Sequence, residues 1–261
     1  MRPVHDVFEE IIRLRDAGRA AAMCTILQTR GSTPGKETMR MLVRDDHSTL
    51  GSVGGGCVEA EVIEMAKDVL RTGRTETRSF TLNKVDLPES GLICGGQLTI
   101  LVEPVVMPTL VLFGGGHVAA AATRIAKEAG FMVRVFDERP EYANAQTHPD
   151  ADHTAAGTWS DLISSIHPAD NLYLVVVTRG HKDDLEVLRA LAGAGVRPRY
   201  LGLLGSRAKL AQLERMLVDD GVDEEFVSMI RTPIGLPIGS RTAGEIGVSL
   251  VAELIQLKNQ G

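Results

Sequence analysis

The chain of 261 residues is acidic, with a formal net charge of −6, and its Lys and Arg residues are dispersed, which argues against a nucleic-acid-binding surface. A single Trp and three Tyr offer few platforms for stacking bases, and three cysteines favour reduced thiols over a disulfide framework. No apolar run approaches the roughly 20 residues that cross a bilayer. Because the N-terminal segment also lacks the apolar core of a signal peptide, we expect a cytoplasmic protein that contacts neither membrane nor nucleic acid.

The first third of the chain predicts a small domain of helices and strands. Apolar residues at helical spacing predict an amphipathic helix that ends near Gly18. Strand-like runs follow at residues 20–28, 39–43, 75–82 and 97–105. Cys24 lies inside the first of these strands, and we expect it to be a small core residue.

A run of three glycines, Gly54, Gly55 and Gly56, stands in the segment LGSVGGGCVE (residues 50–59), directly before a helical pattern. Glycines ahead of a helix expose backbone N–H groups in one direction, and the helix dipole adds positive potential, so the segment predicts an anion-binding site. Cys57 stands at the helix start, where the dipole favours thiolate over thiol. The alternative is a flexible turn followed by a cysteine that is buried in the helix.

A second cysteine stands beside glycines in the segment GLICGG (residues 91–96). Cys94, with Gly95 and Gly96, lies outside any core pattern, so its thiol could meet that of Cys57 at one site. The spacing of the two cysteines matches no zinc signature, and the sequence has neither a CxxC pair nor a Cys/His cluster. The sequence therefore gives no support to a zinc site.

Residues 109–140 have the order strand, glycine turn, helix and strand that is typical of a dinucleotide-binding fold. Gly114 allows the sharp turn, Gly116 leaves room for a diphosphate, and Ala119 lets the helix pack closely on the sheet. Asp137 ends the second strand, where it is placed to accept hydrogen bonds from a ribose hydroxyl pair. The alternative is a purely structural tight turn.

The next apolar strand, residues 171–177, stops at the polar sequence Thr178-Arg179-Gly180-His181. Ligands of open α/β sheets bind outside the carboxyl ends of the strands, so we expect this sequence to face the same crevice as the glycine turn. A lone histidine at a strand end is often structural. Beside an arginine and across from a glycine turn, it predicts a ligand contact.

A further strand, residues 200–204, leads into a helix that begins at Gly205 and Ser206 and carries two basic residues in its first turn. Ser206 is a good N-cap, which is a purely structural role. Basic residues at a helix start are unfavourable for the dipole and indicate anion binding. Thr242 and Glu245 have capping-box spacing and open the last predicted helix.

These elements predict an α/β protein with a C-terminal Rossmann-like parallel sheet and a smaller N-terminal mixed α/β domain. We expect the domains to span residues 1–106 and 109–261, with Met107-Pro108 as the linker and the ligand between them. The motifs LGSVGGGCVE, GLICGG, LVLFGGGHVA with FDERPEYAN, VVVTRGHKDDLEVL, YLGLLGSRAK and PIGLPIG occur in the colinear order of a known family. Over nearly its whole length, the chain resembles the XdhC/CoxI family of xanthine dehydrogenase accessory proteins.

The resemblance implies a molybdenum-cofactor maturation factor that is not itself a catalyst. Such a protein holds molybdopterin while the cofactor is sulfurated and then delivers it to an apo molybdenum hydroxylase. The implied partners are a hydroxylase of the xanthine dehydrogenase type, a cysteine desulfurase and a second copy of the chain. The cofactor-binding residues that the resemblance implies are Gly55, Gly56, Cys57, Glu59, Cys94, Gly95, Gly96, Gly114, Gly116, His117, Thr178, Arg179, Gly180, His181 and Asp184.

Cys57 is also the candidate contact to molybdenum, because a thiolate is a soft ligand. The start of the last helix, ThrAlaGlyGluIle, departs slightly from the family pattern. An oxidoreductase that binds NAD(P) or FAD at the glycine turn is the main alternative, although no separate catalytic constellation is visible. A nucleotide-sensing regulatory domain is a third. The sequence leaves open the client enzyme, the form of the pterin, and whether the turn binds the pterin or a separate dinucleotide.

Overall fold

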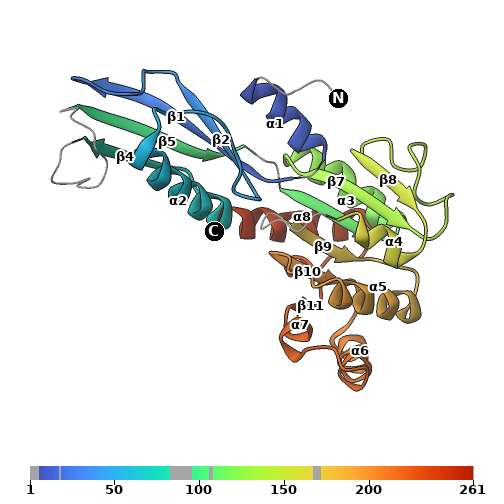
Figure 1. The fold of residues 1–261 in the computed structure, drawn as a ribbon. Helices are drawn as coiled ribbons and strands as arrows, with labels where there is room; N and C mark the ends of the chain where they lie inside the picture. The colour runs from blue at the N-terminus through green and yellow to red at the C-terminus, as the bar shows by residue number, and fades with distance from the viewer. Residues whose placement is uncertain (1–5, 18, 83–95, 106–107, 167–171, 261) are drawn as a thin grey trace. The chain divides into compact units, whose positions relative to one another are not determined.

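The computed structural model describes residues 6–17, 19–82, 96–105, 108–166 and 172–260. The chain divides into two compact units, Met1–Val106 together with Gly261, and Met107–Gln260. Each unit has its own sheet (Figure 1).

The N-terminal unit contains a five-stranded antiparallel sheet in the order β3-β2-β1-β5-β4. Its elements are α1 (Val7–Asp16), β1 (Ala21–Arg30), β2 (Arg40–Arg44), β3 (Thr49–Gly51), α2 (Gly56–Thr72), β4 (Glu76–Thr81) and β5 (Gln97–Pro104). Helix α2 lies along β1 and β5 and is buried through its apolar face, which includes Val58, Val62 and Met65. The end of β1 pairs with the start of β5, Arg30 opposite Gln97. This register places the loop after β1 beside Gly96.

The C-terminal unit contains a six-stranded parallel sheet in the order β11-β10-β9-β6-β7-β8. Its strands are β6 (Thr109–Phe113), β7 (Met132–Asp137), β8 (His153–Ala156), β9 (Leu172–Val176), β10 (Tyr200–Leu203) and β11 (Ile230–Arg231). Its helices are α3 (His117–Glu128), α4 (Trp159–Ser164), α5 (His181–Gly193), α6 (Arg207–Asp219), α7 (Glu224–Ser228) and α8 (Ala243–Gln260). The chain leaves β6 toward β7 and returns to β9 on the other side of β6. The strand order therefore reverses at β6 and β9, which is the switch point where ligands of such sheets bind.

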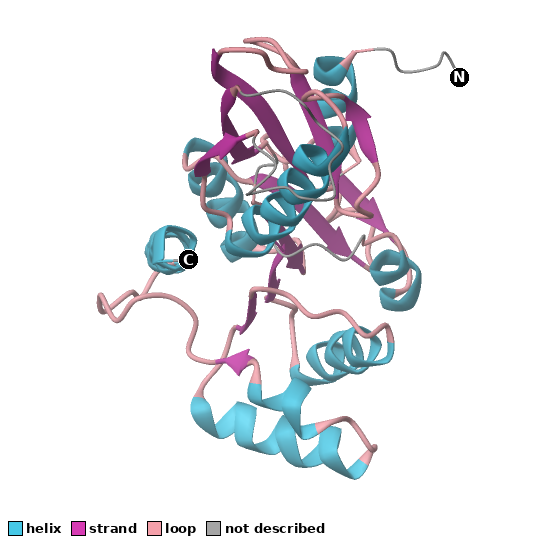
Figure 2. Ribbon diagram, turned by 60° about the vertical axis from the view of Figure 1, so that its left-hand side comes forward, coloured by secondary structure: helices cyan, strands magenta, loops and turns pink. Residues whose placement is uncertain are grey.

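Alternate side chains of the parallel strands feed two separate cores. Leu110 and Leu112 pack with α3 and α8, whereas Val111 and Phe113 pack with α4, α5 and α6. Figure 2 shows helices flanking the strands, with α8 viewed nearly along its axis. Helices α3 and α8 approach each other closely at Gly247, where an added Cβ would lie 3.0 Å from the backbone nitrogen of Ala122.

The predicted fold class is confirmed, and the differences concern four short elements. Strands β3, β8 and β11 and helix α7 were not predicted from the sequence. Strand β8 has no fully buried residue, and β11 has only two residues, so neither leaves an apolar pattern of useful length. Thr242 and Glu245 form the predicted capping box: Glu245 N–H donates to Thr242 Oγ1 at 3.2 Å, and Thr242 N–H donates to Glu245 Oε2 at 3.0 Å.

Candidate functional site

The glycine run of the N-terminal unit bends sharply into α2. Gly54, Gly55 and Gly56 have φ values of 118°, 79° and 64°, a region that side-chain-bearing residues rarely adopt. A Cβ on Gly55 or Gly56 would meet nothing within 4 Å, whereas one on Gly54 would lie 2.8 Å from the nitrogen of Gly35. Gly54 is therefore required both by its backbone conformation and by its close approach to Gly35, whereas Gly55 and Gly56 are required by backbone conformation alone and have open space above them.

The carboxylate of Glu59 binds the glycine run from within. It accepts hydrogen bonds from Gly55 N–H at 2.9 Å, from Val53 N–H at 3.0 Å and from Ser52 Oγ at 2.6 Å. Partial burial by itself would raise the pKa of Glu59, but the hydrogen bonds from Ser52 and from the backbone outweigh it and hold the pKa below its ordinary value. One N–H group of the glycine run, that of Gly55, thus already binds an anion of the protein. Glu59 was predicted as a cofactor ligand, and in this structure its carboxylate holds the loop.

Close backbone approaches gather three loops at one end of the N-terminal sheet. Gly54 lies against Gly35, and a Cβ on Gly96 would lie 2.3 Å from the carbonyl oxygen of Ser32. The two cysteine motifs therefore border the same loop after β1. Cys57 is half-buried at the start of α2. The other predicted members of the second motif, Cys94 and Gly95, lie outside the described residues.

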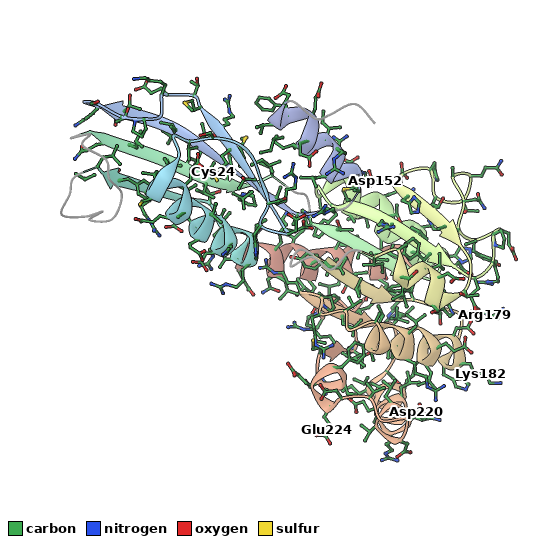
Figure 3. All side chains as sticks on the ribbon, in the orientation of Figure 1. Cys24, Asp152, Arg179, Lys182, Asp220 and Glu224 are labelled. Carbon is green, nitrogen blue, oxygen red and sulfur yellow. The ribbon has the colours of Figure 1, made fainter. Side chains whose placement is uncertain are left out.

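The remaining thiol is buried. Cys24 is 0% exposed in β1 (Figure 3), and burial raises its pKa to about 12. The prediction of a core cysteine at this position is confirmed.

The glycine turn of the C-terminal unit stands at the switch point. Gly114 has a φ of 112°, and a Cβ there would lie 2.5 Å from the carbonyl oxygen of Val177 and 3.0 Å from Cα of Thr178. This close approach brings the turn after β6 beside the segment after β9. The structure thus places the glycine turn and the Thr178–His181 sequence at one edge of the sheet, as expected.

The middle glycine, to which the motif assigned no role, has the tightest surroundings. A Cβ on Gly115 would lie 1.8 Å from the carbonyl oxygen of Tyr142. His148, only 2% exposed, places Nε2 3.0 Å from the carbonyl oxygen of Gly115; a carbonyl only accepts, so Nε2 carries the proton. The loop after β7 therefore packs onto the turn. Sequence reasoning missed Tyr142 and His148 because that loop has no periodic pattern. The one available signal was Gly115 itself, a glycine for which the dinucleotide-binding motif has no role.

Asp137 binds the turn rather than facing open space. Its carboxylate accepts the N–H of Gly115 at 2.9 Å, the N–H of Arg139 at 3.0 Å, and the Arg139 guanidinium at 2.9 and 3.1 Å. Burial alone would raise the pKa of Asp137, but the Arg139 side chain and the N–H of Gly115 hold it below the ordinary value. Asp137 is 3% exposed. Both oxygens that were expected to bind ribose hydroxyls are therefore engaged within the protein.

Two helices begin at this edge without a side-chain cap. Gly116 is the N-cap of α3 and Gly180 that of α5, and neither start has a side-chain capping hydrogen bond. A Cβ on either glycine would meet nothing within 4 Å. The first residues of the two helices, His117 and His181, are exposed. Uncapped helix starts beside open space suit an anionic group such as a phosphate.

The remaining predicted residues at this edge have structural partners. Thr178 Oγ1 donates to Asp184 Oδ1 at 2.7 Å, and Arg179, which Figure 3 shows near the start of α5, pairs with Asp183 at 2.8 Å. Buried Asp184 also faces the Lys209 ammonium at 2.5 Å. Lys209 is one of the two basic residues in the first turn of the helix after β10, which predicted anion binding, and its ion pair with Asp184 gives it a partner within the protein.

Gly205 and Ser206 lead into α6. Ser206 Oγ accepts the N–H of Lys209 at 3.2 Å, so Ser206 has the N-cap role named as the structural alternative. A Cβ on Gly205 would lie 2.7 Å from Cδ of Lys209, so this glycine leaves room for the lysine side chain.

Across the described part of the chain, no group of three or more His, Cys, Asp or Glu residues is arranged to hold a metal ion. Over the same residues, no helix combines the length and apolar character of a membrane span.

Comparison with known families decides the identity. The model of the XdhC Rossmann domain matches residues 110–254, and that of the XdhC and CoxI family matches residues 14–81. This chain belongs to the XdhC/CoxI family. The two matches fall in different units of the structure, one on the parallel sheet and one on the antiparallel sheet.

Curated relatives of this XdhC/CoxI protein extend the match. It is 32% identical to the uncharacterized protein YqeB of Escherichia coli (strain K12), over 97% of this chain and 46% of YqeB. It is 31% identical to a probable subunit of xanthine dehydrogenase from Bacillus subtilis (strain 168), over 61% of this chain and 45% of that protein. The identity to the molybdenum cofactor insertion chaperone PaoD of Escherichia coli (strain K12) is 24%, over 93% of this chain and 85% of PaoD. The chain spans about half the length of the first two relatives.

A solved structure supports the fold. A crystal structure described as a xanthine dehydrogenase from Bacillus halodurans superimposes with a TM-score of 0.52 at 21% identity, over 97% of this chain and 95% of that one.

Proposed function

We propose that this XdhC/CoxI protein binds the molybdenum cofactor and delivers it to an apo molybdenum hydroxylase of the xanthine dehydrogenase type. The observation that carries the proposal is the match to a molybdenum cofactor insertion chaperone over 93% of this chain, which spans both units. The Bacillus subtilis relative, whose name refers to xanthine dehydrogenase, supports the choice of client.

The residues fit such a cargo. The pterin of the cofactor carries a phosphate or a nucleotide diphosphate, and the uncapped starts of α3 and α5 at Gly116 and Gly180 offer N–H groups to it. Half-buried Cys57 is the soft donor of the N-terminal unit. We assign the phosphate to the switch point of the C-terminal unit and the metal end to Cys57, with Cys94 as a second thiol.

We extend the proposal to sulfuration, with a cysteine desulfurase as the source of sulfur and a pair of chains as the working form. No observation favours the alternative of an oxidoreductase. Both Asp137 oxygens are bound by Gly115 and Arg139, and the loop after β7 lies on Gly115, so the ribose subsite of a dinucleotide fold is filled by the protein itself.

The test is retention and transfer of the cofactor. The full chain, made in cells that synthesise molybdopterin, should release a fluorescent pterin after oxidation and should activate a purified apo xanthine dehydrogenase. Cys57→Ser keeps the size but replaces a soft, ionisable donor with a hard neutral one, so it should abolish both signals. Cys24→Ala is the matched control, because Cys24 is buried in a strand and is expected to have no contact with cargo.

Alkylation separates the two cysteines directly. In variants that keep a single thiol, half-buried Cys57 should react with iodoacetamide at neutral pH, whereas the raised pKa of Cys24 and its burial should protect it. Equal rates at the two positions, together with normal activation by Cys57→Ser, would rule out the thiolate role. Absence of any pterin from the wild-type protein would rule out the proposed function itself.

A further inference from the structure

Strand β4, at one end of the N-terminal sheet (Figure 1), is the longest edge strand in the described part of the chain. It has six residues, whereas β3, β8 and β11, at the other three sheet ends, have three, four and two. Proteins commonly keep edge strands short, or protect them with Pro, Lys or a bulge, because an unpaired edge can pair with another chain. The sequence of β4, ETRSFT, contains neither Pro nor Lys, and its pairing with β5 runs without a register shift. This edge therefore lacks the usual protections.

The outer edge of β4 presents backbone hydrogen-bonding groups at alternate residues. Just after the strand, Leu82 N–H donates to the carbonyl oxygen of Gly96 at 2.8 Å, in the register of the β4–β5 ladder. Because antiparallel ladder bonds alternate along a strand, the even-numbered residues of β4 bond to β5, and the odd-numbered ones direct their N–H and C=O groups outward. These outward residues are Thr77, Ser79 and Thr81, and all three are exposed. Within the described residues, no strand lies beyond β4 to pair with them.

The charges of β4 are self-complementary. Glu76 and Arg78 lie two residues apart, on one face of the strand, and form an ion pair at 2.7 Å within the chain. When two copies of β4 pair antiparallel about a twofold axis through Thr77, each Glu76 lies opposite the other copy's Arg78. An axis through Arg78 instead places two guanidinium groups opposite each other, which is destabilising, and an axis through Ser79 gives neither charge an opposite partner. The charges therefore select the axis through Thr77, where the two outward-facing threonines exchange backbone hydrogen bonds.

We propose that β4 joins two copies of this chain as an antiparallel pair centred on Thr77, so that the two five-stranded sheets become continuous. A twofold interface uses the same patch on both partners, so a strand that complements itself fits a second copy better than an unrelated protein. Backbone hydrogen bonds supply the attraction, and the Glu76–Arg78 pairs set the register, because exposed ion pairs contribute little to affinity. The inference rests on the pair of chains in the proposed function and names the surface that joins them.

Charge reversal tests whether the occupant of the edge is a second copy. Sedimentation equilibrium of the full wild-type chain should show dimers. Glu76→Arg and Arg78→Glu each place two like-charged pairs in the interface, so each should raise the dimer dissociation constant about tenfold to a hundredfold. An equimolar mixture of the two variants restores both opposite-charge pairs and should recover dimers of one chain of each kind. Arg71→Glu is the matched control, because it reverses one charge of an exposed ion pair with Asp68 on α2 and should leave the equilibrium unchanged.

Cross-linking tests the register. In a chain whose Cys57 and Cys94 are replaced by serine, Cys24 remains buried and does not interfere. Thr77→Cys places two thiols directly opposite each other, with Cα atoms about 5.5 Å apart, so mild oxidation should give a covalent dimer. Ser79→Cys is the matched control: its two copies lie four residues apart along the strands, about 13 Å, which is too far for a disulfide.

The outcomes separate this inference from the proposed function. Dimers that both charge reversals weaken and that Thr77→Cys cross-links support the inference, even in a protein that retains no molybdenum cofactor, and in that case cofactor delivery fails alone. A monomeric wild type, or a dimer that neither reversal weakens, overturns the inference, and normal cofactor retention by the same protein leaves delivery standing. A cross-link through Ser79→Cys in place of Thr77→Cys would overturn the register. A monomeric wild type whose activation of the hydroxylase is lost in Glu76→Arg would assign the edge to the client and overturn the second copy.

Discussion

Each of the two glycine turns of this protein is held by a carboxylate of the protein itself, and the two carboxylates differ in how far along the chain they lie from the glycine. In the N-terminal unit, Glu59 accepts the N–H of Gly55 from four residues along the chain. In the C-terminal unit, Asp137 accepts the N–H of Gly115 from the end of the neighbouring strand. Each turn therefore carries an internal carboxylate where the sequence predicted a ligand, and an acid near a glycine turn is as much a sign of self-binding as of ligand binding.

The difference lies in what covers the turn. Gly55 and Gly56 have open space above them, whereas Gly115 lies under the carbonyl of Tyr142. The carboxylate of Asp137 is also neutralised by Arg139, but Glu59 receives only neutral donors. We expect the C-terminal turn to be the more rigid of the two, and we expect the N-terminal turn to be the one that changes conformation when a ligand binds.

The largest effect should come from Gly115→Ala. Its Cβ would lie 1.8 Å from the carbonyl oxygen of Tyr142, so the loop must move, at a cost of about 3 kcal/mol. Urea unfolding followed by Trp159 fluorescence measures this, because the single Trp lies in the C-terminal unit. Gly116→Ala, with nothing within 4 Å, should cost less than about 1 kcal/mol. Equal costs at the two positions would show that the loop does not rest on Gly115.

The next largest loss of stability is expected from neutralising the two carboxylates that hold the turns. Asp137→Asn should cost about 2 kcal/mol, because it weakens charge-assisted bonds to buried and half-buried donors, and Glu59→Gln should cost about 1 kcal/mol. Trp159 fluorescence reports the first. Pulsed labelling of Cys24 against urea, in a chain with the other cysteines replaced by serine, reports the second, since Cys24 is buried in the N-terminal sheet. A larger cost for Glu59→Gln would reverse the proposed order of rigidity.

A smaller effect is expected from Gly56→Ala. The φ of 64° strains any side-chain-bearing residue, and no atom lies within 4 Å of the added Cβ, so the cost should be about 1 kcal/mol of backbone strain. Gly180→Ala also adds a Cβ in open space but at an extended φ of −171°, and should be nearly neutral. Cys24 labelling and Trp159 fluorescence measure the two variants. A neutral Gly56→Ala would mean that the turn relaxes freely.

The smallest effect is the acid dependence of the N-terminal turn. The pKa of Glu59 is lowered in the folded state, so its contribution is fully present above the unfolded pKa of about 4.3 and is lost as the pH falls through the folded value. Glu59→Gln should therefore flatten the fall in stability of the N-terminal unit below about pH 4.5. Glu61→Gln, at a half-buried neighbour on α2, is the control. Identical acid profiles for wild type and Glu59→Gln would contradict the hydrogen bonds described for this loop.

The sequence by itself determined the long elements, the α/β class and the family. Helical spacing located α1, α2 and α3, and unbroken apolar runs located β6 and β9, because burial of one helix face or of both strand faces leaves a pattern in the order of residues. Turn chemistry located the capping box of α8 and the N-cap Ser206 for the same reason, since each depends on residues a few positions apart.

Only the tertiary structure decided the state of the predicted ligands. Nothing in the residue order shows that Arg139 turns back onto Asp137, that Tyr142 and His148 lie on Gly115, or that Lys209 reaches Asp184. These contacts join loops whose conformation is set by hydrogen bonds and close packing between distant segments, and such bonds leave no periodic signal.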